Sequence, residues 1–302
     1  MAHSGWGRFW SLGCALLLVP AGASGQTTGR AGLEAAMAAR IHQDTAAVGV
    51  ALIDLASGEA LGPGALRRFH AASTMKVPVL IELARRIDAG DFHWDDSLLV
   101  RNAFRSLADG STFQLDRADD SDSTVYEMVG QLVPIRLLAR LMIIRSSNLA
   151  TNLLIDQLGA ARVTATARSL GADSIEVRRG VEDQKAFDLG WNNTTTARDL
   201  AVLLAALQRG QAASAPATAV ALDMLRGQEF NDGIPAGLPP GTPVAHKTGE
   251  LTAVFHDAAL IYPPGRPPFV LVVLTKGYAP RAQAMKLQAD LARLAWNAIV
   301  GP

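Results

Sequence analysis

Strand-like segments occur only near the two ends of this 302-residue chain, and helical periods fill the interval between them. A buried strand is expected at 48–54, with a return strand beginning at 59–61. Three more are expected at 244–247, 257–262 and 269–275, where short apolar runs are separated by turns rich in glycine and proline. Segments far apart in sequence must therefore pair in one sheet, into which a helical lobe is inserted.

Apolar residues recur at the helical period outside these strands. The expected helices cover 29–44, 135–144, 150–158, 195–209 and 281–300, together with a helix that starts at Ser73 and ends at Gly90. The region 95–235 contains no convincing alternating strand. Its irregular stretch at 174–193 is of a length that tends to be functional in a compact domain.

The fold class expected from this order is α/β (α+β). It consists of an antiparallel sheet flanked by helices plus an inserted all-helical lobe. The sheet lobe would take about 26–72 and 236–302, and the helical lobe about 73–235.

The N-terminus has the order of a secretory signal peptide. Arg8 precedes an apolar run between Phe9 and Pro20, and small residues follow as far as Gly25. The run is too short to span a bilayer comfortably, and an uncleaved interfacial anchor is the alternative. We therefore expect a signal peptide at 1–25 and a secreted or periplasmic catalytic domain at 26–302, with no stable membrane span after cleavage.

Charge and cysteine content limit the possible partners. Lysine plus arginine (28) balances aspartate plus glutamate (28), so no overall field attracts nucleic acid or an anionic membrane.

Cys14, the single cysteine, lies inside the expected signal peptide. Structural zinc sites draw on several Cys or His ligands. We expect no metal, no cofactor and no disulfide, and nothing demands more than a monomer.

Ser73-Thr74-Met75-Lys76 is a Ser-x-x-Lys motif at the start of a predicted helix. One helical turn separates the two side chains, so Nζ of Lys76 can reach Oγ of Ser73. A serine hydroxyl is a weak nucleophile until a base takes its proton, and a lysine with a lowered pKa can do so. Taken alone, the motif is more often an N-cap serine beside a surface lysine.

Two further motifs follow along the chain. Ser146-Ser147-Asn148 offers a hydroxyl and a carboxamide that could relay a proton to a leaving nitrogen and bind a substrate amide. Lys247-Thr248-Gly249, expected at the end of a strand, offers a cation and a hydroxyl for a substrate carboxylate. The next N–H, from Glu250, could supply an oxyanion donor beside that of Ser73. Each motif taken alone is more often a helix cap or a turn.

The order and context of the three motifs, 73 and then 101 residues apart, resemble those of the serine β-lactamases and penicillin-binding proteins. The segment 193–200 similarly looks like the Thr-Thr-Thr helix start that follows the omega loop of class A β-lactamases, and 255–259 looks like that family's strand after Lys-Thr-Gly. The resemblance covers nearly the whole mature chain. It implies the sheet-plus-helical-lobe fold and hydrolysis of a small-molecule β-lactam substrate through an acyl-enzyme.

The resemblance also implies roles for the motif residues. Ser73 would be the acylated nucleophile, with Lys76 as its proton acceptor or part of the relay. Ser146 would carry a proton to the β-lactam nitrogen, and Asn148 would bind the acylamido side chain. Lys247 and Thr248 would bind the carboxylate, next to Gly249.

The chain departs from the class A pattern at three places. Ser147 replaces the usual aspartate, which removes a carboxylate that helps fix its loop. The omega loop lacks Glu-x-x-Leu-Asn, and counting back from Thr194 places the family's glutamate near Gly180, so a small shift would be needed to bring Glu182 or Asp183 to the hydrolytic water. Glu250 would either repel the substrate's carboxylate or favour a substrate that bears a cation, and the sequence leaves both open.

Three functions fit these motifs. The first is a class A-like β-lactamase with Glu182 as the deacylating base. The alternatives are a D-alanyl-D-alanine peptidase that acts on peptidoglycan stems and a penicillin-binding sensor that acylates without turnover.

Overall fold

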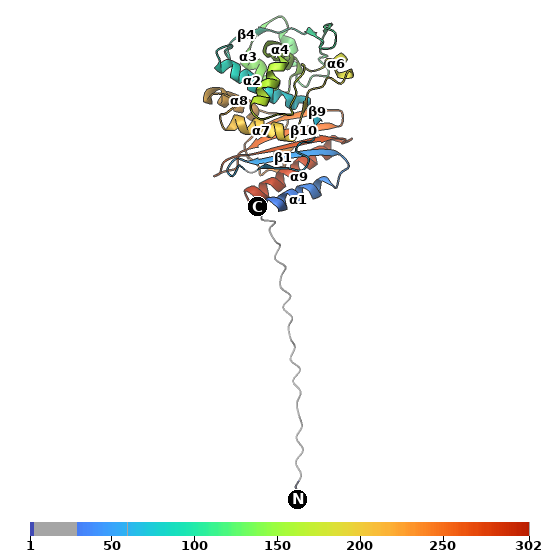
Figure 1. Cartoon of the computed structure of the whole chain (residues 1–302), viewed down its shortest axis with the longest axis vertical. Coiled ribbons are helices and arrows are strands. Elements are labelled where there is room, and N and C mark those ends of the chain that lie inside the picture. The colour runs from blue at the N-terminus through green and yellow to red at the C-terminus, as the bar shows by residue number, and fades with distance from the viewer. Residues whose placement is uncertain (3–28, 59, 302) are drawn as a thin grey trace.

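A five-stranded antiparallel sheet forms the centre of the protein in the computed structural model, which describes residues 1–2, 29–58 and 60–301 (Figure 1). Its strand order is β2-β1-β11-β10-β9. The bounds are β1 Ala47–Asp54, β2 Ala60–Leu61, β9 Val244–Leu251, β10 Val254–Ile261 and β11 Phe269–Lys276. β1 pairs along its whole length with β11, from Ala47↔Lys276 to Asp54↔Phe269. The predicted pairing of the two ends of the chain is thus confirmed. The expected signal peptide and Cys14 lie outside the described residues.

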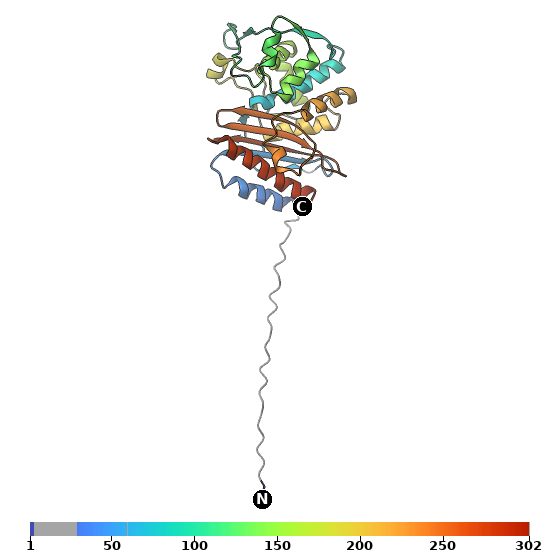
Figure 2. The same cartoon turned by 180° about the vertical axis from the view of Figure 1, so that it is seen from behind.

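Helices cover both faces of this sheet. α1 (Arg30–Ile41) and α9 (Arg281–Ile299) lie on one face, and the helical lobe lies on the other (Figures 1 and 2). Side chains along β11 alternate between two cores: Phe269, Leu271 and Val273 pack toward α1 and α9, and Val270, Val272 and Leu274 pack toward the helical lobe. Each such buried side chain contributes about 1.5–3 kcal/mol. Because both faces are covered, these strands read as continuous apolar runs.

The helical lobe is built from short helices. They are η1 Ala72–Met75, α2 Lys76–Asp88, η2 Thr124–Met128, α3 Ile135–Ile144, α4 Asn148–Leu158, α5 Ala160–Ser169, α6 Gln184–Asp188, α7 Ala197–Gln208, α8 Ala215–Arg226 and η3 Ile234–Gly237. This confirms the expected antiparallel sheet with flanking helices and an inserted helical lobe. α5 and α8 were not predicted, because runs rich in alanine and threonine give little apolar contrast around the helix.

The lobe also contains strands of two or three residues. They pair as β3 (Phe69–His70) with β8 (Thr194–Thr195), β4 (Ser97–Leu99) with β7 (Leu132–Pro134), and β5 (Phe104–Arg105) with β6 (Thr112–Phe113). Strands this short cannot produce a visible alternation in the sequence, so the pattern of 95–235 does not predict them.

Two predicted boundaries were wrong in ways that affect the site. Ser73 lies in the 3-10 turn η1, and the α-helix begins at Lys76. Lys247-Thr248-Gly249 lies inside β9 rather than at its end, because the hairpin with β10 continues to Leu251↔Val254. Across the described part of the chain, no helix combines the length and apolar character that crossing a membrane requires.

Candidate active site

Ser73 lies in the turn η1, directly before α2, and lines a cavity. The preceding residue, Ala72, has a φ of 45°, a left-handed conformation that residues other than glycine seldom adopt. Its N–H donates a hydrogen bond of 3.0 Å to Nδ1 of His70. This bond helps hold the unusual backbone that presents Ser73 to the cavity.

The side-chain nitrogen of Lys76 is surrounded by four oxygen atoms. Nζ lies 2.9 Å from Ser73 Oγ, 3.0 Å from Ser146 Oγ, 2.7 Å from the Ser146 carbonyl oxygen and 2.8 Å from Asn148 Oδ1. The carbonyl and carboxamide oxygens can only accept, so they take two N–H groups of Lys76. The remaining bonding direction of Nζ faces the two hydroxyl groups. In the neutral amine this direction holds the lone pair that can accept the Ser73 proton.

Burial lowers the pKa of Lys76 from its usual value of 10.5 to about 7. The negative charges of Asp120 and Glu182 act in the opposite direction without offsetting burial. A substantial fraction of Lys76 is therefore neutral near pH 7, which is the state a general base needs.

Lys247 is a second fully buried lysine, on β9. Its Nζ donates to the carbonyl oxygen of its neighbour Thr248 at 2.9 Å. Burial, reinforced by the charge of Lys76, holds the pKa of Lys247 well below its usual range. An anionic group bound beside Lys247 would stabilise the charged form that burial disfavours.

β9 lies at the end of the strand order, and its backbone approaches Ser73 closely at Gly249. A Cβ on Gly249 would lie 3.0 Å from Thr74 N and 3.1 Å from Ser73 N, which is too close without a shift of the backbone. Glycine therefore lets β9 pack closely against the N–H groups of η1. Thr248 and Gly249 line the same cavity as Ser73.

Ser146 lies in the tight turn between α3 and α4, with a φ of 61°. Ser147 is the N-cap of α4, and the carboxylate that this position lacks is supplied by Asp120 from another loop. Both carboxylate oxygens of Asp120 lie 2.9 Å from the backbone N of Asn148. A negative charge at this helix start stabilises the turn. No motif in the sequence predicts this contact, because Asp120 and Asn148 lie 28 residues apart.

Glu182 lies near the same turn and has a φ of 62°. Its Oε1 accepts a hydrogen bond of 2.7 Å from Nδ2 of Asn148, whose Oδ1 contacts Lys76. Burial raises the pKa of Glu182, although the hydrogen bond from Asn148 acts against this. Glu182 and Ser73 line a second cavity of about 270 Å³.

Gly180, where the sequence spacing had placed the family's glutamate, leaves no room for a side chain. A Cβ there would clash with Oδ1 of Asn152. Asn152 fixes this part of the loop by accepting from the Val181 N–H at 2.6 Å and donating to the Val181 carbonyl oxygen at 3.0 Å. The carboxylate that lines the cavity with Ser73 comes instead from two positions later, at Glu182.

Asp183, the other carboxylate that the sequence left as a candidate base, anchors the loop. It is buried, and it accepts hydrogen bonds of 2.7 Å from Ser106 Oγ and from the Leu107 N–H. Lys185 lies 2.7 Å from Asp109 on the same hairpin. Lys185 also lies 2.8 Å from Oγ of Ser111. We call these four contacts between the omega loop and the β5–β6 hairpin the hairpin clasp. Its members are far apart in sequence, so no motif predicts it.

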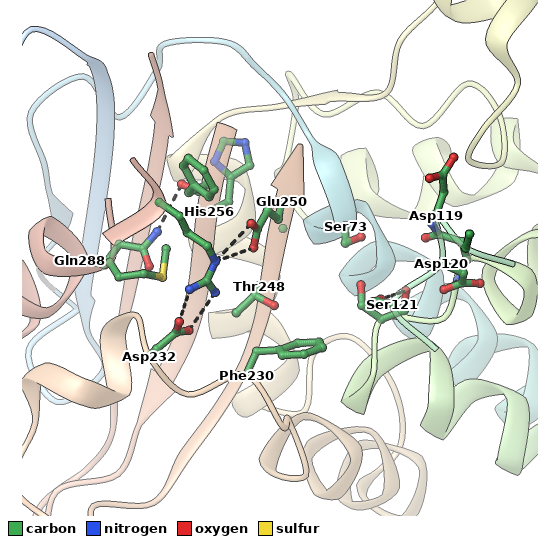
Figure 3. A pocket seen from close by; sticks show the side chains of 17 residues that line it. Ser73, Asp119, Asp120, Ser121, Phe230, Asp232, Thr248, Glu250, His256 and Gln288 are labelled. Carbon is green, nitrogen blue, oxygen red and sulfur yellow. Dashed lines mark hydrogen bonds and ion pairs between the residues drawn. The ribbon is translucent and has the colours of Figure 1, made fainter. Parts of the chain in front are cut away.

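Glu250 lies beside Ser73 as expected, but its charge is paired. Its carboxylate accepts from Nε of Arg281 at 3.0 Å, and Arg281 also pairs with Asp232 (Figure 3). Sequence analysis missed Arg281 and Asp232, because these three residues come from β9, the start of α9 and the loop before η3.

The cavity beside Ser73 has a volume of about 460 Å³ and lies between β9 and the loop that holds Asp119, Asp120 and Ser121 (Figure 3). Within the ranges that the structure describes, no three histidine, cysteine or carboxylate side chains converge as metal ligands. The arrangement suits covalent chemistry at Ser73.

The beta-lactamase enzyme family model matches residues 32–299 of the chain. Carbapenem-hydrolyzing beta-lactamase KPC of Klebsiella oxytoca is 33% identical over 161 residues, covering 52% of this chain and 54% of that protein. The match thus spans about half the length of that relative. A beta-lactamase of Amycolatopsis lactamdurans is 29% identical over 262 residues, covering 85% and 82%.

Solved structures match over more of the chain. The L158E mutant of PBP-A, determined as an acyl-enzyme complex with penicillin-G, is 27% identical with a TM-score of 0.77. The match covers 89% of this chain and 96% of PBP-A.

Proposed function

The chain belongs to the beta-lactamase enzyme family, and from that membership we propose that it is a class A-like serine hydrolase that opens β-lactam rings through a Ser73 acyl-enzyme. The observation that carries this proposal is the 2.9 Å contact between Ser73 Oγ and the buried Nζ of Lys76. The pKa of Lys76 is lowered to about 7, so the hydroxyl group of Ser73, which lines the cavity, is in contact with a base.

Acylation begins when neutral Lys76 takes the proton of Ser73. Oγ then attacks the β-lactam carbonyl carbon, and the backbone N–H groups of Ser73 and Glu250 hold the oxyanion. Ser146 passes a proton from Lys76 to the ring nitrogen as the C–N bond breaks, supported by the 3.0 Å distance between its Oγ and Nζ. The product is an ester on Ser73.

The substrate is held by groups on both sides of Ser73. Lys247 and Thr248 bind its carboxylate, and the Asn148 carboxamide binds the acylamido side chain. The contact of buried Lys247 with the Thr248 carbonyl and the position of Thr248 in the cavity lining support the first assignment.

Deacylation uses Glu182 as the general base. Its carboxylate takes a proton from water, the resulting hydroxide attacks the ester, and Ser73 leaves with a proton returned through Lys76. The cavity shared with Ser73 and the raised pKa of Glu182 support this role.

A penicillin-binding protein that acylates and then stalls is the second candidate. It is favoured by the hydrogen bond that ties Glu182 to Asn148, and by the similarity to PBP-A. In this case Glu182 would not activate water, and the ester on Ser73 would persist.

The proposed cellular setting is the periplasm or the exterior. The protein acts as a monomer of residues 26–302 after removal of 1–25. The small-molecule substrate is a β-lactam or an acyl-D-alanyl-D-alanine peptide. Mass photometry of the exported protein tests the oligomeric state, and N-terminal sequencing tests the cleavage.

One experiment tests the function and separates its two forms. The protein is mixed with a chromogenic cephalosporin while ring opening and intact mass are followed together. Turnover without a lasting adduct supports a β-lactamase, whereas a stable adduct on Ser73 supports the penicillin-binding form. Ser73→Ala must abolish both signals, and Ser169→Ala, an exposed hydroxyl at the end of α5, is the control. Full ring opening by Ser73→Ala would eliminate the mechanism.

A further inference from the structure

Arg281 lines the cavity beside Ser73, and two protein carboxylates already bind it. Its Nε lies 3.0 and 3.2 Å from the two carboxylate oxygens of Glu250. Nη2 lies 3.1 Å from Oδ1 of Asp232, and Nη1 donates to the other oxygen of that carboxylate. We call Arg281, Glu250 and Asp232 the Arg281 triad.

The Arg281 triad carries a net negative charge. The hydrogen bonds between Arg281 and Asp232 lower the pKa of the Asp232 carboxyl and raise the pKa of the Arg281 guanidinium, so these two groups remain ionised. Arg281 pairs with both carboxylates, so one cationic side chain faces two acidic ones. Arg281 is therefore not available as an uncompensated cation for a substrate carboxylate.

The facing side of the cavity adds negative charge rather than balancing it. Asp119 and Asp120 line it from the loop opposite β9 (Figure 3). Asp120 is committed to the start of α4, whereas the side chain of Asp119 is exposed. Lys76 and Lys247 are buried near Ser73 and Thr248, and burial lowers the pKa of both.

We propose that Glu250 and Asp232 are specificity-determining residues that favour β-lactams with a cationic substituent next to the substrate's carboxylate. This rests on the proposed function, in which Lys247 and Thr248 hold that carboxylate on β9. Glu250 follows Thr248 on the same strand. The substituent on the ring carbon next to the one that bears the carboxylate therefore faces the Arg281 triad. In a cephalosporin this is the C3 substituent.

The size of the effect follows from the exposure of the triad. The side chains of Arg281, Glu250 and Asp232 are 42%, 52% and 48% exposed, so water and salt screen their charges. Exposed charge pairs contribute modestly, which corresponds to a change of about two- to fivefold for each charge removed.

The test uses two cephalosporins with the same thienylacetamido side chain. Cephaloridine carries a pyridinium group at C3, and cephalothin carries a neutral acetoxymethyl group. The second-order rate constant for acylation is measured for both with the full chain, by intact mass after rapid quenching, at low and high salt. Comparing the ratio of the two constants between proteins cancels the difference in intrinsic reactivity of the drugs.

The variants are Glu250→Gln and Asp232→Asn, which keep shape and remove one charge. Asp156→Asn is the matched control, because Asp156 is an exposed carboxylate 2.8 Å from Arg101 and lies outside the cavity lining. We expect the cationic-to-neutral ratio to fall about two- to fivefold in each variant and to fall with salt in the native protein, with no change in Asp156→Asn.

Four results would overturn the proposal. An unchanged ratio in both variants removes the charge preference, and a salt-independent ratio in the native protein does so without any variant. Faster acylation by both drugs at an unchanged ratio means that the two carboxylates only withhold Arg281 from the substrate. If neither drug forms an adduct and neither ring is opened, the proposed function fails and the preference fails with it.

Discussion

Asn148 donates a hydrogen bond of 2.7 Å to the carboxylate of Glu182. The same carboxamide accepts from Lys76 Nζ at 2.8 Å through its oxygen. The candidate bases for the two half-reactions are therefore linked through one side chain, although each is proposed to act on a different proton. This link allows the two half-reactions to be tested separately.

Glu182→Gln is expected to leave acylation of Ser73 intact and to slow deacylation about 10²–10⁴-fold, because the amide cannot take a proton from water. The side-chain oxygen of glutamine still accepts from Asn148, so the link itself is retained. Intact mass should show the acyl-enzyme accumulating. Glu176→Gln, on the same loop and paired with Arg178, serves as the control, and an unchanged deacylation rate would eliminate Glu182 as the base.

Lys76 should give acylation a pH dependence centred near 7. Its pKa is about 7 in the folded protein, so the rate of adduct formation should rise as pH increases through 7 and the amine becomes neutral. Stopped-flow acylation from pH 5 to 9 measures this, with a buffer series at constant ionic strength. A flat profile would show that Lys76 does not accept the proton.

The same lowered pKa predicts how stability depends on pH. Between about 7 and 10.5 the unfolded chain keeps the Lys76 proton that the folded protein has lost, so the free energy of unfolding rises with pH there. The contribution is about 1.4 kcal/mol per pH unit. Urea unfolding of the native protein and of Lys76→Met should diverge with this slope, and parallel curves would contradict it.

Asp183→Asn should weaken the hairpin clasp. The loss of charge-assisted bonds to Ser106 and Leu107 is expected to lower the free energy of unfolding by about 1.5–3 kcal/mol. Because Glu182 is the adjacent residue, deacylation should slow while acylation is retained. Lys185→Met, which removes only the exposed part of the clasp, should cost less than about 1 kcal/mol. Equal loss of both half-reactions would indicate general disorder of the site instead.

Gly249→Ala should impair acylation. The new Cβ would meet the backbone nitrogens of Ser73 and Thr74 at 3.1 and 3.0 Å, which forces β9 away from η1. Overpacking of about 1–3 kcal/mol corresponds to a fall in the acylation rate of about 5- to 160-fold. Burst kinetics measure this, with Gly29→Ala, which meets nothing within 4 Å, as the control. An unchanged burst rate would show that close approach at Gly249 is not required.

The sequence by itself determined the sheet and its pairing partners. Strands such as β1 and β11 are continuous apolar runs at opposite ends of the chain, and burial on both faces leaves few other ways to pair them. It also proposed Ser73, Lys76, Ser146 and Asn148, through motifs whose order resembles that of the serine β-lactamases and penicillin-binding proteins. The structure places the side chains of Ser73, Ser146 and Asn148 around Nζ of Lys76.

Only the tertiary structure decided which charged side chains lie around Ser73 and Lys76 and how those charges are paired. Asp120 replaces the carboxylate missing at Ser147, and Arg281 neutralises part of the charge of Glu250. These partners come from separate loops and helices, and a charged side chain leaves no periodic signal that names its partner. The lowered pKa of Lys76 has the same origin, because desolvation depends on everything that packs around Nζ and not on the four residues of the motif.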